Sequence, residues 1–223
     1  MVQIIYADVS PLNDDDIFNA FYESASEERQ KKTDSFRFRK DKNLCLGASA
    51  VIDSGLRKYN LCEKEMTYGT YENQKPYFKN APEIHFNISH SETMAAAAFS
   101  DGKIGIDIEK IKDADLKIAK RFFAEEEYKY LGRFTDKEKQ NREFYRLWTL
   151  KESFMKVTGL GLKLPLNQFC INIDENGVSV KYDNAEKDYF FYEYCIKGYC
   201  ISVCSENEIK KPDIVSIGFV KGR

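Results

Sequence analysis

One alternating segment near the middle of the chain constrains the fold more than any other feature. In residues 104–109, three isoleucines alternate with Gly105, Asp107 and Glu109. A period of two is typical of a strand with one apolar face, and it puts both carboxylates on the same face. Residues two apart on a strand lie roughly 7 Å apart at Cα, so their oxygens can converge on one cation. Without a cation the two carboxylates repel each other.

A second segment, 144–156, has the spacing of an amphipathic helix. Its apolar residues recur at intervals of three and four, which indicates one packed face. Glu152 and Lys156 lie on a different face, one turn apart and side by side. Taken singly, each segment is an ordinary surface pattern, and a Glu–Lys pair of this kind stabilises a helix by only about 0.3–0.5 kcal/mol. Their combination is much more specific.

The composition is that of a folded chain with an ample core. Of 223 residues, 43% are hydrophobic and 14% aromatic, which excludes general disorder. The 34 Lys and Arg nearly balance the 36 Asp and Glu, which argues against a nucleic-acid binder. The start of the chain lacks a signal-peptide pattern, and no apolar run is long enough to span a membrane. We therefore expect a cytoplasmic protein that binds neither nucleic acid nor membrane.

The cysteines and histidines do not predict a zinc site. The six cysteines form no C-x-x-C pair, and the two histidines are His85 and His90. Reduced thiols are the expectation for a cytoplasmic chain. His90 lies in a predicted Ser89-His90-Ser91 turn, where hydroxyl, imidazole and backbone N–H groups can bind an anion. No G-x-S-x-G segment accompanies this turn, so a serine hydrolase is not indicated.

Further elements are predicted from local patterns and turn signals. Strands are expected at 2–9, 84–88, 94–99, 178–182, 189–196 and 199–204. Helices are expected at 14–25, 44–56 and 119–130, with a basic helical stretch from 26 to 42. The helix that carries Glu152 is expected to begin at a capping box in 135–138 and to end at Gly159.

Two motifs and three shorter segments resemble one enzyme family. G-I-D-I-E at 105–109 and W-x-x-K-E-S-x-x-K at 148–156 resemble the signature motifs of the phosphopantetheinyl transferases. The shorter segments occur in the family's order: Gln74-Lys75-Pro76, Phe86-Asn87-Ile88-Ser89-His90-Ser91 and Ala119-Lys120-Arg121-Phe122-Phe123. The resemblance extends from about Ser26 to Cys204, and the length fits the surfactin-synthetase-activating, single-chain type.

The resemblance implies an α+β fold made of two similar halves related by pseudo-twofold symmetry. Each half is expected to pack a long helix on a small antiparallel sheet, with the site in the cleft between the halves. Residues 100–103 are expected to form a tight hairpin turn into the alternating strand, because Asp-Gly suits such a turn. This turn divides an N-terminal half, 1–102, from a C-terminal half, 103–223. Since one chain contains both halves, we expect a monomer.

The resemblance also implies a reaction. Phosphopantetheine is transferred from coenzyme A, with Mg²⁺ as the metal, to a serine hydroxyl of an apo acyl or peptidyl carrier protein. The residues assigned to the metal are Asp107, Glu109 and Glu152, whose oxygens are ligands that suit Mg²⁺. Glu152, directly or through a metal-bound water, is the candidate general base. Lys156 is the second candidate catalytic residue, because its charge can neutralise the pyrophosphate.

Contacts to coenzyme A and to the carrier protein are implied in the same way. A single lysine is more often a solvated surface residue, but the resemblance assigns coenzyme A contacts to Arg29, Lys32, Lys75, Ser89, His90 and Lys156. The chain departs from the family at Lys42-Asn43-Leu44-Cys45, where the family commonly has an Arg and a small hydroxyl residue. The carrier protein is expected to bind the basic region 110–125, which complements an acidic partner.

Two other classes of protein stay open at the level of the sequence. One is another Mg²⁺-dependent phosphotransferase that uses a nucleotide, which competition between coenzyme A and ATP would distinguish. The other is a non-catalytic module that binds coenzyme A or a carrier protein. The three carboxylates together with Lys156 argue against the second class, because a binding module has no need of a polarising metal.

Overall fold

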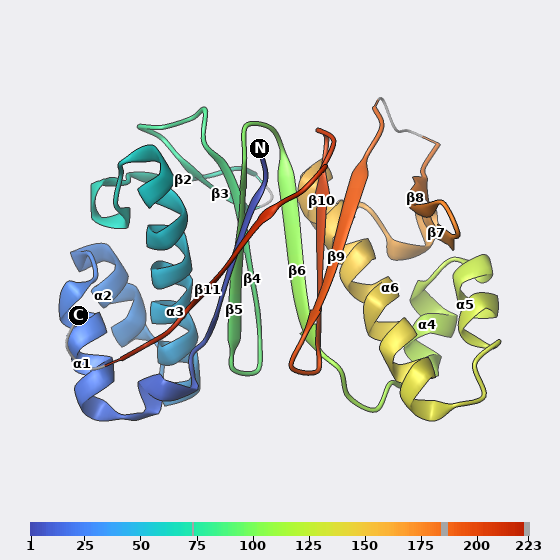
Figure 1. Ribbon diagram of the computed structural model, residues 1–223, viewed down its shortest axis with the longest axis horizontal. Coiled ribbons are helices and arrows are strands. Elements are labelled where there is room, and N and C mark those ends of the chain that lie inside the picture. The colour runs from blue at the N-terminus through green and yellow to red at the C-terminus, as the bar shows by residue number, and fades with distance from the viewer. Residues whose placement is uncertain (73, 184–186, 221–223) are drawn as a thin grey trace. The chain divides into compact units, whose positions relative to one another are not determined.

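The computed structural model describes residues 1–72, 74–183 and 187–220 (Figure 1). The chain divides into two compact units. Unit 1 consists of Met1–Tyr71, Pro76–Asp101 and Lys211–Arg223, and unit 2 consists of Glu72–Lys75 and Gly102–Lys210. The segment after Lys210, which the sequence analysis assigns to the C-terminal half, thus belongs to unit 1. Residues 73, 184–186 and 221–223 of the two predicted halves lie outside the described residues.

Unit 1 contains a four-stranded sheet in the order β11-β1-β5-β4. Its strands are β1 (Gln3–Asp8), β4 (His85–Ser91), β5 (Met94–Ser100) and β11 (Asp213–Ile217). The prediction of a strand at 94–99 is confirmed, although this segment is rich in alanine. All seven residues of β5 are buried, because the strand is central in the sheet and is covered by a helix. The β1–β5 and β4–β5 pairings are antiparallel as expected, whereas β11, a strand that was not predicted, pairs with β1 in parallel.

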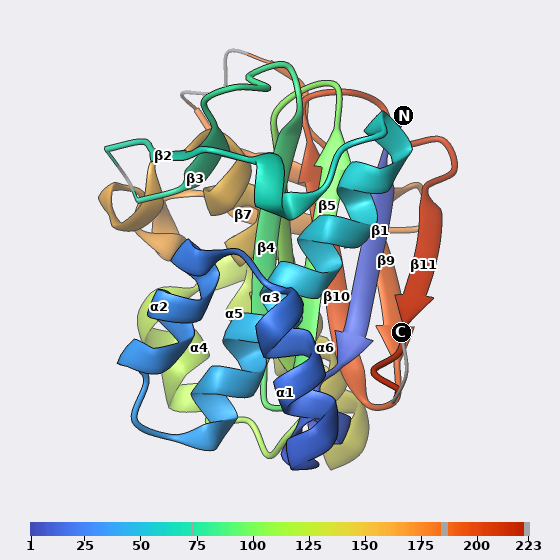
Figure 2. The ribbon, with the colours of Figure 1, turned by 90° about the vertical axis from the view of Figure 1, so that its left-hand side faces the viewer.

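The described residues of unit 1 include three α-helices, α1 (Asp15–Ser24), α2 (Glu27–Ser35) and α3 (Arg39–Leu56). The long helix α3 packs against β1 and β5, as Figure 2 shows. The predicted basic helix over 26–42 is instead two helices, because Phe36 and Phe38 have extended backbones. The side chain of Arg39 anchors the start of α3 by donating to the backbone oxygen of Leu12 at 2.8 Å.

Short elements complete unit 1. They are the 3-10 helices η1 (Ser10–Asn13), η2 (Arg57–Tyr59) and η3 (Glu63–Glu65), and the two-stranded sheet of β2 (Tyr68–Thr70) and β3 (Pro76–Phe78). Aromatic rings fill the core between these elements and the large sheet. Phe78 stacks on Phe86 with ring centroids 4.2 Å apart, and Phe86 stacks on Phe99 at 5.8 Å.

Unit 2 packs one long helix on a three-stranded antiparallel sheet. The strands, in the order β6-β10-β9, are β6 (Ile104–Lys110), β9 (Phe190–Ile196) and β10 (Tyr199–Ser205). The helix, α6 (Lys137–Thr158), begins at Asp136, whose carboxylate accepts the Lys139 N–H at 2.7 Å, and ends at Gly159 with φ of 72°. A hairpin of β7 (Cys170–Asp174) and β8 (Gly177–Lys181) and the 3-10 helices η4 (Gly161–Lys163) and η5 (Leu166–Gln168) follow α6. The α+β class is confirmed.

The prediction of one continuous helix at 119–130 is wrong. Two short helices, α4 (Leu116–Phe122) and α5 (Glu125–Leu131), occupy the region. The break occurs because the Glu127 carboxylate folds back and accepts the backbone N–H of Ala124 at 2.8 Å, which caps α5 as a separate helix.

The hairpin predicted at 100–103 is also wrong. Strand β5 pairs with β1 and β4, whereas β6 pairs with β10, in a register that sets Ile108 opposite Ile201. The turn therefore links two sheets instead of closing one hairpin. Its local sequence gave no sign of this, because the partner of β6 comes from a strand about ninety residues later in the chain.

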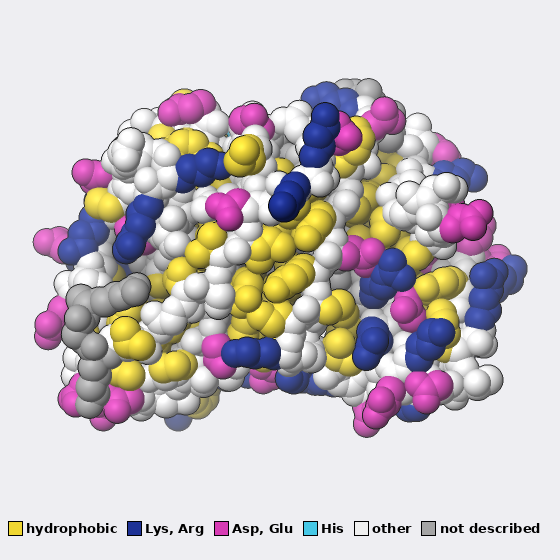
Figure 3. Space-filling model, viewed as in Figure 1, with side chains coloured by type: hydrophobic (Ala, Val, Ile, Leu, Met, Phe, Trp, Pro, Cys, Tyr) yellow, Lys and Arg dark blue, Asp and Glu magenta, His cyan; other side chains and the backbone are white. Residues whose placement is uncertain are grey.

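Charges of both signs are interspersed on the surface. The face in Figure 3 shows Lys and Arg side chains among Asp and Glu side chains, in keeping with the totals of 34 and 36. A face with such mixed charges carries no large single-sign field. Among the described residues, no helix combines the length and the hydropathy needed to cross a membrane.

Candidate functional site

Strand β6 and helix α6 come into backbone contact at Gly105. A Cβ atom placed on this residue would collide with the backbone oxygen of Ser153 and would lie 2.7 Å from the backbone nitrogen of Val157. Any side chain at position 105 would therefore push the helix away from the strand. Asp107 and Glu109 follow on the same face of β6. The contact at Gly105 thus turns both carboxylates toward α6.

Lys156 of α6 is bound to Asp107 of β6. Its Nζ lies 2.7 Å from Asp107 Oδ1 and donates to the backbone oxygen of Ile106 at 2.9 Å. The Asp107 side chain is 6% exposed and the Lys156 side chain 26% exposed, so water screens this ion pair only weakly. Asp107 was predicted to bind a metal and Lys156 a pyrophosphate, whereas in the structure the two side chains neutralise each other.

Glu152 lies within range of the same charges. Burial raises the pKa of its carboxyl group, the negative charges of Asp107 and Glu109 raise it further, and Lys156 opposes them. A raised pKa makes this carboxylate a better proton acceptor than an exposed one. Asp107, Glu109, Glu152 and Lys156 are therefore one electrostatically coupled group, which we call the acidic cluster.

The chemistry of the acidic cluster fits a hard divalent cation. Its three carboxylates offer oxygen donors, which Mg²⁺ prefers, and added positive charge relieves their mutual repulsion. Within the part of the chain that the structure describes, no three His, Cys, Asp or Glu side chains already form a metal cage. The Lys156 ammonium already contacts Asp107 Oδ1. A metal ion at this oxygen would therefore compete with Lys156.

Lys75 is a buried amine that ties β6 to α6. Its Nζ donates to the backbone oxygens of Ile104 at 2.7 Å and Lys156 at 2.9 Å. Burial, with the positive charges of Lys103 and Lys156, lowers the pKa of Lys75 to about 8. From the sequence, Lys75 was predicted only as a coenzyme A contact. Its second role, holding together the two elements that carry the acidic cluster, depends on long-range contacts that the sequence does not show.

A second buried ion pair orients α6, and sequence reasoning missed it. Lys151 and Glu127 are 0% and 1% exposed, and Lys151 Nζ lies 2.6 and 2.7 Å from the two carboxylate oxygens. Glu127 also accepts the backbone N–H of Ile171 at 2.7 Å, and Lys151 donates to the backbone oxygen of Phe169 at 2.9 Å. The pair thus joins α5, α6 and β7. The available signal was a lysine within the apolar stripe of the helix.

In unit 1, the predicted coenzyme A contacts Arg29 and Lys32 have different surroundings. The Arg29 guanidinium is buried and lies 2.6 Å from the Glu63 carboxylate and 3.5 Å from the Tyr68 hydroxyl. Lys32 is exposed on the next turn of α2. Both residues line a cavity of about 170 Å³. The strongest charge interaction of Arg29 in the structure is therefore with a carboxylate of its own chain.

Ser89 and His90 lie on a strand, and the prediction of a turn at these residues is wrong. Strand β4 continues to Ser91, and the chain reverses at Glu92 and Thr93, where Glu92 has φ of 53°. Alternation along the strand points the half-buried Ser89 and the exposed His90 to opposite faces of the sheet.

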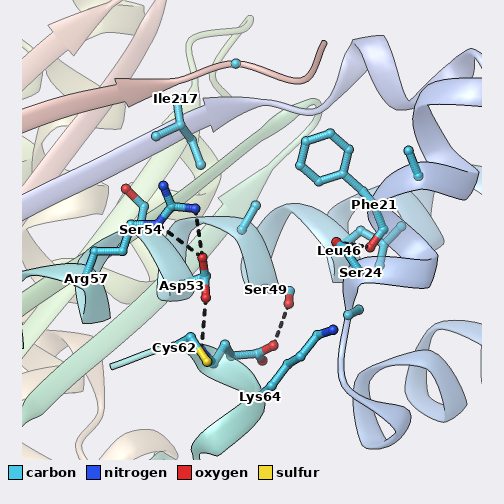
Figure 4. A pocket seen from close by; sticks show the side chains of 15 residues that line it. Phe21, Ser24, Leu46, Ser49, Asp53, Ser54, Arg57, Cys62, Lys64 and Ile217 are labelled. Carbon is cyan, nitrogen blue, oxygen red and sulfur yellow. Dashed lines mark hydrogen bonds and ion pairs between the residues drawn. The ribbon is translucent and has the colours of Figure 1, made fainter. Parts of the chain in front are cut away.

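A larger cavity in unit 1, of about 370 Å³, is lined by none of the predicted site residues (Figure 4). Several polar and charged groups on its wall are hydrogen-bonded to one another. Asp53 accepts from Arg57 at 3.1 Å and from the backbone N–H of Glu63 at 3.0 Å, and Ser49 donates to the Glu63 carboxylate at 2.6 Å. Because Glu63 also binds Arg29, its carboxylate lies between the two cavities of this unit.

The predicted site residues therefore form separate groups. Unit 2 brings together Asp107, Glu109, Glu152, Lys156 and Lys75. In unit 1, Arg29 and Lys32 share a cavity, and Ser89 and His90 are neighbours on β4.

Comparisons with known proteins identify relatives of the chain. The family model described as the 4′-phosphopantetheinyl transferase superfamily matches residues 103–204. The chain is 36% identical over 202 residues to the 4′-phosphopantetheinyl transferase Sfp of Bacillus subtilis (strain 168), a match that covers 89% of this chain and 90% of that protein. It is 32% identical over 211 residues to the 4′-phosphopantetheinyl transferase gsp of Aneurinibacillus migulanus, with coverages of 92% and 86%. A solved holo-(acyl-carrier-protein) synthase from Bacillus anthracis str. Ames, in complex with CoA (3′,5′-ADP), matches 46% of this chain and 92% of its own at 18% identity and a TM-score of 0.41.

The Lys151–Glu127 pair predicts a strongly non-additive effect on stability. Lys151→Met leaves a buried carboxylate and Glu127→Gln leaves a buried ammonium, and each change is expected to cost about 3–5 kcal/mol. The double variant removes both charges, so its loss is expected to be well below the sum of the single losses. Urea unfolding followed by circular dichroism measures all three. Lys129→Met, in an exposed pair with Glu125, is the control and should change stability little. Additive losses in the double variant would contradict the pairing.

The lowered pKa of Lys75 predicts a rise of stability at alkaline pH. Between the folded-state pKa of about 8 and the ordinary value of 10.5, the unfolded chain binds a proton that the folded chain does not. The free energy of unfolding of the wild type, relative to that of Lys75→Met, should therefore rise by about 2–3 kcal/mol as the pH increases through this window. Urea unfolding of both proteins at several pH values measures the difference between their free energies of unfolding. Groups that titrate equally in both proteins cancel in this difference. If this difference does not change with pH, the lowered pKa of the buried Lys75 amine is contradicted.

Proposed function

The chain belongs to the 4′-phosphopantetheinyl transferase superfamily, and on that premise we propose that it transfers phosphopantetheine from coenzyme A to a serine of an apo acyl or peptidyl carrier protein. The observation that carries the proposal is the acidic cluster, in which three carboxylates and a lysine meet between β6 and α6. The similarity to named transferases over most of the chain supports the same reaction class.

The reaction breaks a phosphoanhydride bond of coenzyme A and forms a phosphodiester bond to the carrier serine. The serine oxygen of the carrier forms a bond to the phosphorus next to the pantetheine arm, and the bond from this phosphorus to the bridging pyrophosphate oxygen breaks. The products are the phosphopantetheinylated carrier and adenosine 3′,5′-bisphosphate. The serine proton must leave, and the leaving phosphate gains negative charge, so the site needs a base and a source of positive charge.

Glu152 is the proposed base. Its burial and the neighbouring Asp107 and Glu109 raise its pKa, which increases the affinity of the carboxylate for the serine proton. Its place on α6, one turn before Lys156, sets the base and the cation side by side on one helix. Proton acceptance and charge neutralisation can then act on the same pyrophosphate.

The positive charge comes from two sources. Asp107, Glu109 and Glu152 would hold Mg²⁺, which when bound neutralises charge on the pyrophosphate oxygens. The second source is Lys156, whose ammonium contacts Asp107. A pyrophosphate bound at the acidic cluster would lie beside this ammonium, which would stabilise the leaving phosphate. Lys75 holds the backbones of β6 and α6 at this point and adds a second ammonium.

The remaining coenzyme A contacts are proposed in unit 1. Lys32 is an exposed cation on the wall of the 170 Å³ cavity, suited to a phosphate group. Arg29 is proposed as a second contact on the same wall, where Glu63 balances its charge and its guanidinium would act as a hydrogen-bond donor. The Ser89 hydroxyl and the His90 imidazole are proposed as further hydrogen-bond donors. Because they lie on opposite faces of β4, each would donate to a different phosphate group.

The carrier protein is proposed to bind the region 110–125. On α4, the exposed apolar side chains Ile118 and Phe122, 38% and 42% exposed, are bordered by basic residues. The Arg121 guanidinium lies 4.9 Å from the centroid of the Phe122 ring, which gives this surface a defined cation–π contact. An apolar centre bordered by positive charge suits an acidic partner. We propose that the enzyme acts as a monomer in the cytoplasm.

The reaction is tested by intact-mass spectrometry of an apo carrier protein incubated with the chain, coenzyme A and Mg²⁺, with and without chelator. A mass increase by one phosphopantetheine group is expected and should vanish with chelator. Asp107→Asn is expected to reduce the rate at least about a hundredfold, because it removes a charge from the metal and lysine site. Glu175→Gln, in the exposed β7–β8 turn, is the matched control and should keep the full rate. Full activity of Asp107→Asn would exclude the acidic cluster as the active site.

A further inference from the structure

Strands β9 and β10 form a hairpin (Figure 1), and their register sets two cysteines opposite each other. Cys195 is the register partner of Cys200. This pair comes directly after the Ile196–Tyr199 pair, which flanks the turn. The turn residues Lys197 and Gly198 have positive φ values of 47° and 75°, as in a two-residue type I′ turn. In such a hairpin the pair beside the turn exchanges hydrogen bonds and the next pair does not. Residues of a non-hydrogen-bonded pair lie about 4.5 Å apart at Cα, within the range that a disulfide spans.

The two thiols differ in access. Cys195 is exposed at the edge strand of the sheet, whereas Cys200 on the neighbouring strand is 3% exposed. Both are free thiols in the structure. A small oxidant in water can therefore reach the first sulfur directly, while the second is shielded and adjacent. This is the arrangement of an attacking cysteine next to a resolving one.

The surroundings of Cys195 favour its thiolate. The hydrogen bond with Cys200 lowers the pKa of the Cys195 thiol, and the positive charges of Arg142 and Arg146 on α6 act in the same direction, against burial and Glu193. The partly exposed Cys170 differs, because burial and then Glu127 raise its thiol pKa to about 11. Reactivity toward an oxidant follows the thiolate fraction, so Cys195 is favoured over Cys170.

We propose that Cys195 and Cys200 form a peroxide-sensitive dithiol that closes into a cross-strand disulfide. The Cys195 thiolate attacks one oxygen of hydrogen peroxide, breaks the O–O bond and becomes a sulfenic acid, and the released hydroxide takes a proton to give water. The Cys200 sulfur then attacks the Cys195 sulfur and displaces the hydroxyl group, which leaves as a second water. Two thiols lose two electrons and two hydrogens, and one peroxide gains them.

The position of the disulfide relates it to the acidic cluster. Cys200 is also the register partner of Glu109 on β6, so Glu109, Cys200 and Cys195 form one row across the sheet. Directly opposed residues of an antiparallel pair point to the same face. The disulfide between β9 and β10 would thus form next to β6, the strand that carries the Glu109 carboxylate of the acidic cluster. The inference itself rests on the hairpin geometry and is independent of the proposed transfer reaction.

Peptide mapping of the full chain tests the proposal. The protein is treated with hydrogen peroxide, its remaining thiols are alkylated under denaturing conditions, and it is digested with trypsin. Cleavage after Lys197 separates the two cysteines, so the disulfide joins peptide 188–197 to peptide 198–210. The joined peptide is expected after peroxide and should be lost after dithiothreitol. Fragmentation distinguishes Cys200 from Cys204, which lies on the same peptide.

Two variants define the roles of the sulfurs. Cys200→Ser should stop at the Cys195 sulfenic acid, which dimedone traps, and should give no joined peptide. Cys170→Ser, the matched control outside the hairpin, should form the joined peptide as the wild type does. The proposal is overturned if peroxide leaves both thiols of the wild type free for alkylation. It is equally overturned if Cys195 is oxidised to sulfinic or sulfonic acid without joining Cys200, or joins Cys204 instead.

Discussion

The structure of unit 2 depends on one close contact, the approach of helix α6 to strand β6 at Gly105. The absence of a side chain there lets the two backbones touch, and the next two residues on the same face are Asp107 and Glu109. The helix brings Glu152 and Lys156 to these carboxylates. The three negative charges repel one another, and an added cation would relieve this repulsion.

Other buried charges keep α6 in this position. The Lys151–Glu127 pair fixes the rotation of the helix from its far side, and Lys75 links the helix to the start of β6. Each of these groups is removed from water and is stabilised by specific partners, which makes the arrangement sensitive to the loss of any one of them. The geometry of the acidic cluster therefore depends on Lys151, Glu127 and Lys75, which are not members of the cluster.

Local periodicity predicted the central elements, while long-range partners decided the rest. The alternation in 104–109 and the helical stripe in 144–156 were sufficient to predict β6 and α6. That their carboxylates and Lys156 meet at one site was implied by the resemblance to the family, and the direct Lys156–Asp107 ion pair was not predicted. The sequence could not show that Arg29 pairs with Glu63, since those residues are brought together only by tertiary packing. The pairing of β6 with β10, the return of β11 to β1 and the break between α4 and α5 likewise depend on distant residues. The roles of the site residues stay predictions.

The central claim is that the acidic cluster takes up a divalent cation. Isothermal titration calorimetry of Mg²⁺ into the chain in the presence of coenzyme A measures this directly, with Glu109→Gln as the test variant and Glu175→Gln as the control of equal charge change. The account predicts one Mg²⁺ site in the wild type and the control, weakened about tenfold or more in Glu109→Gln, which loses one charged oxygen ligand. Equal Mg²⁺ affinity in all three proteins, or no binding in the wild type, would contradict it.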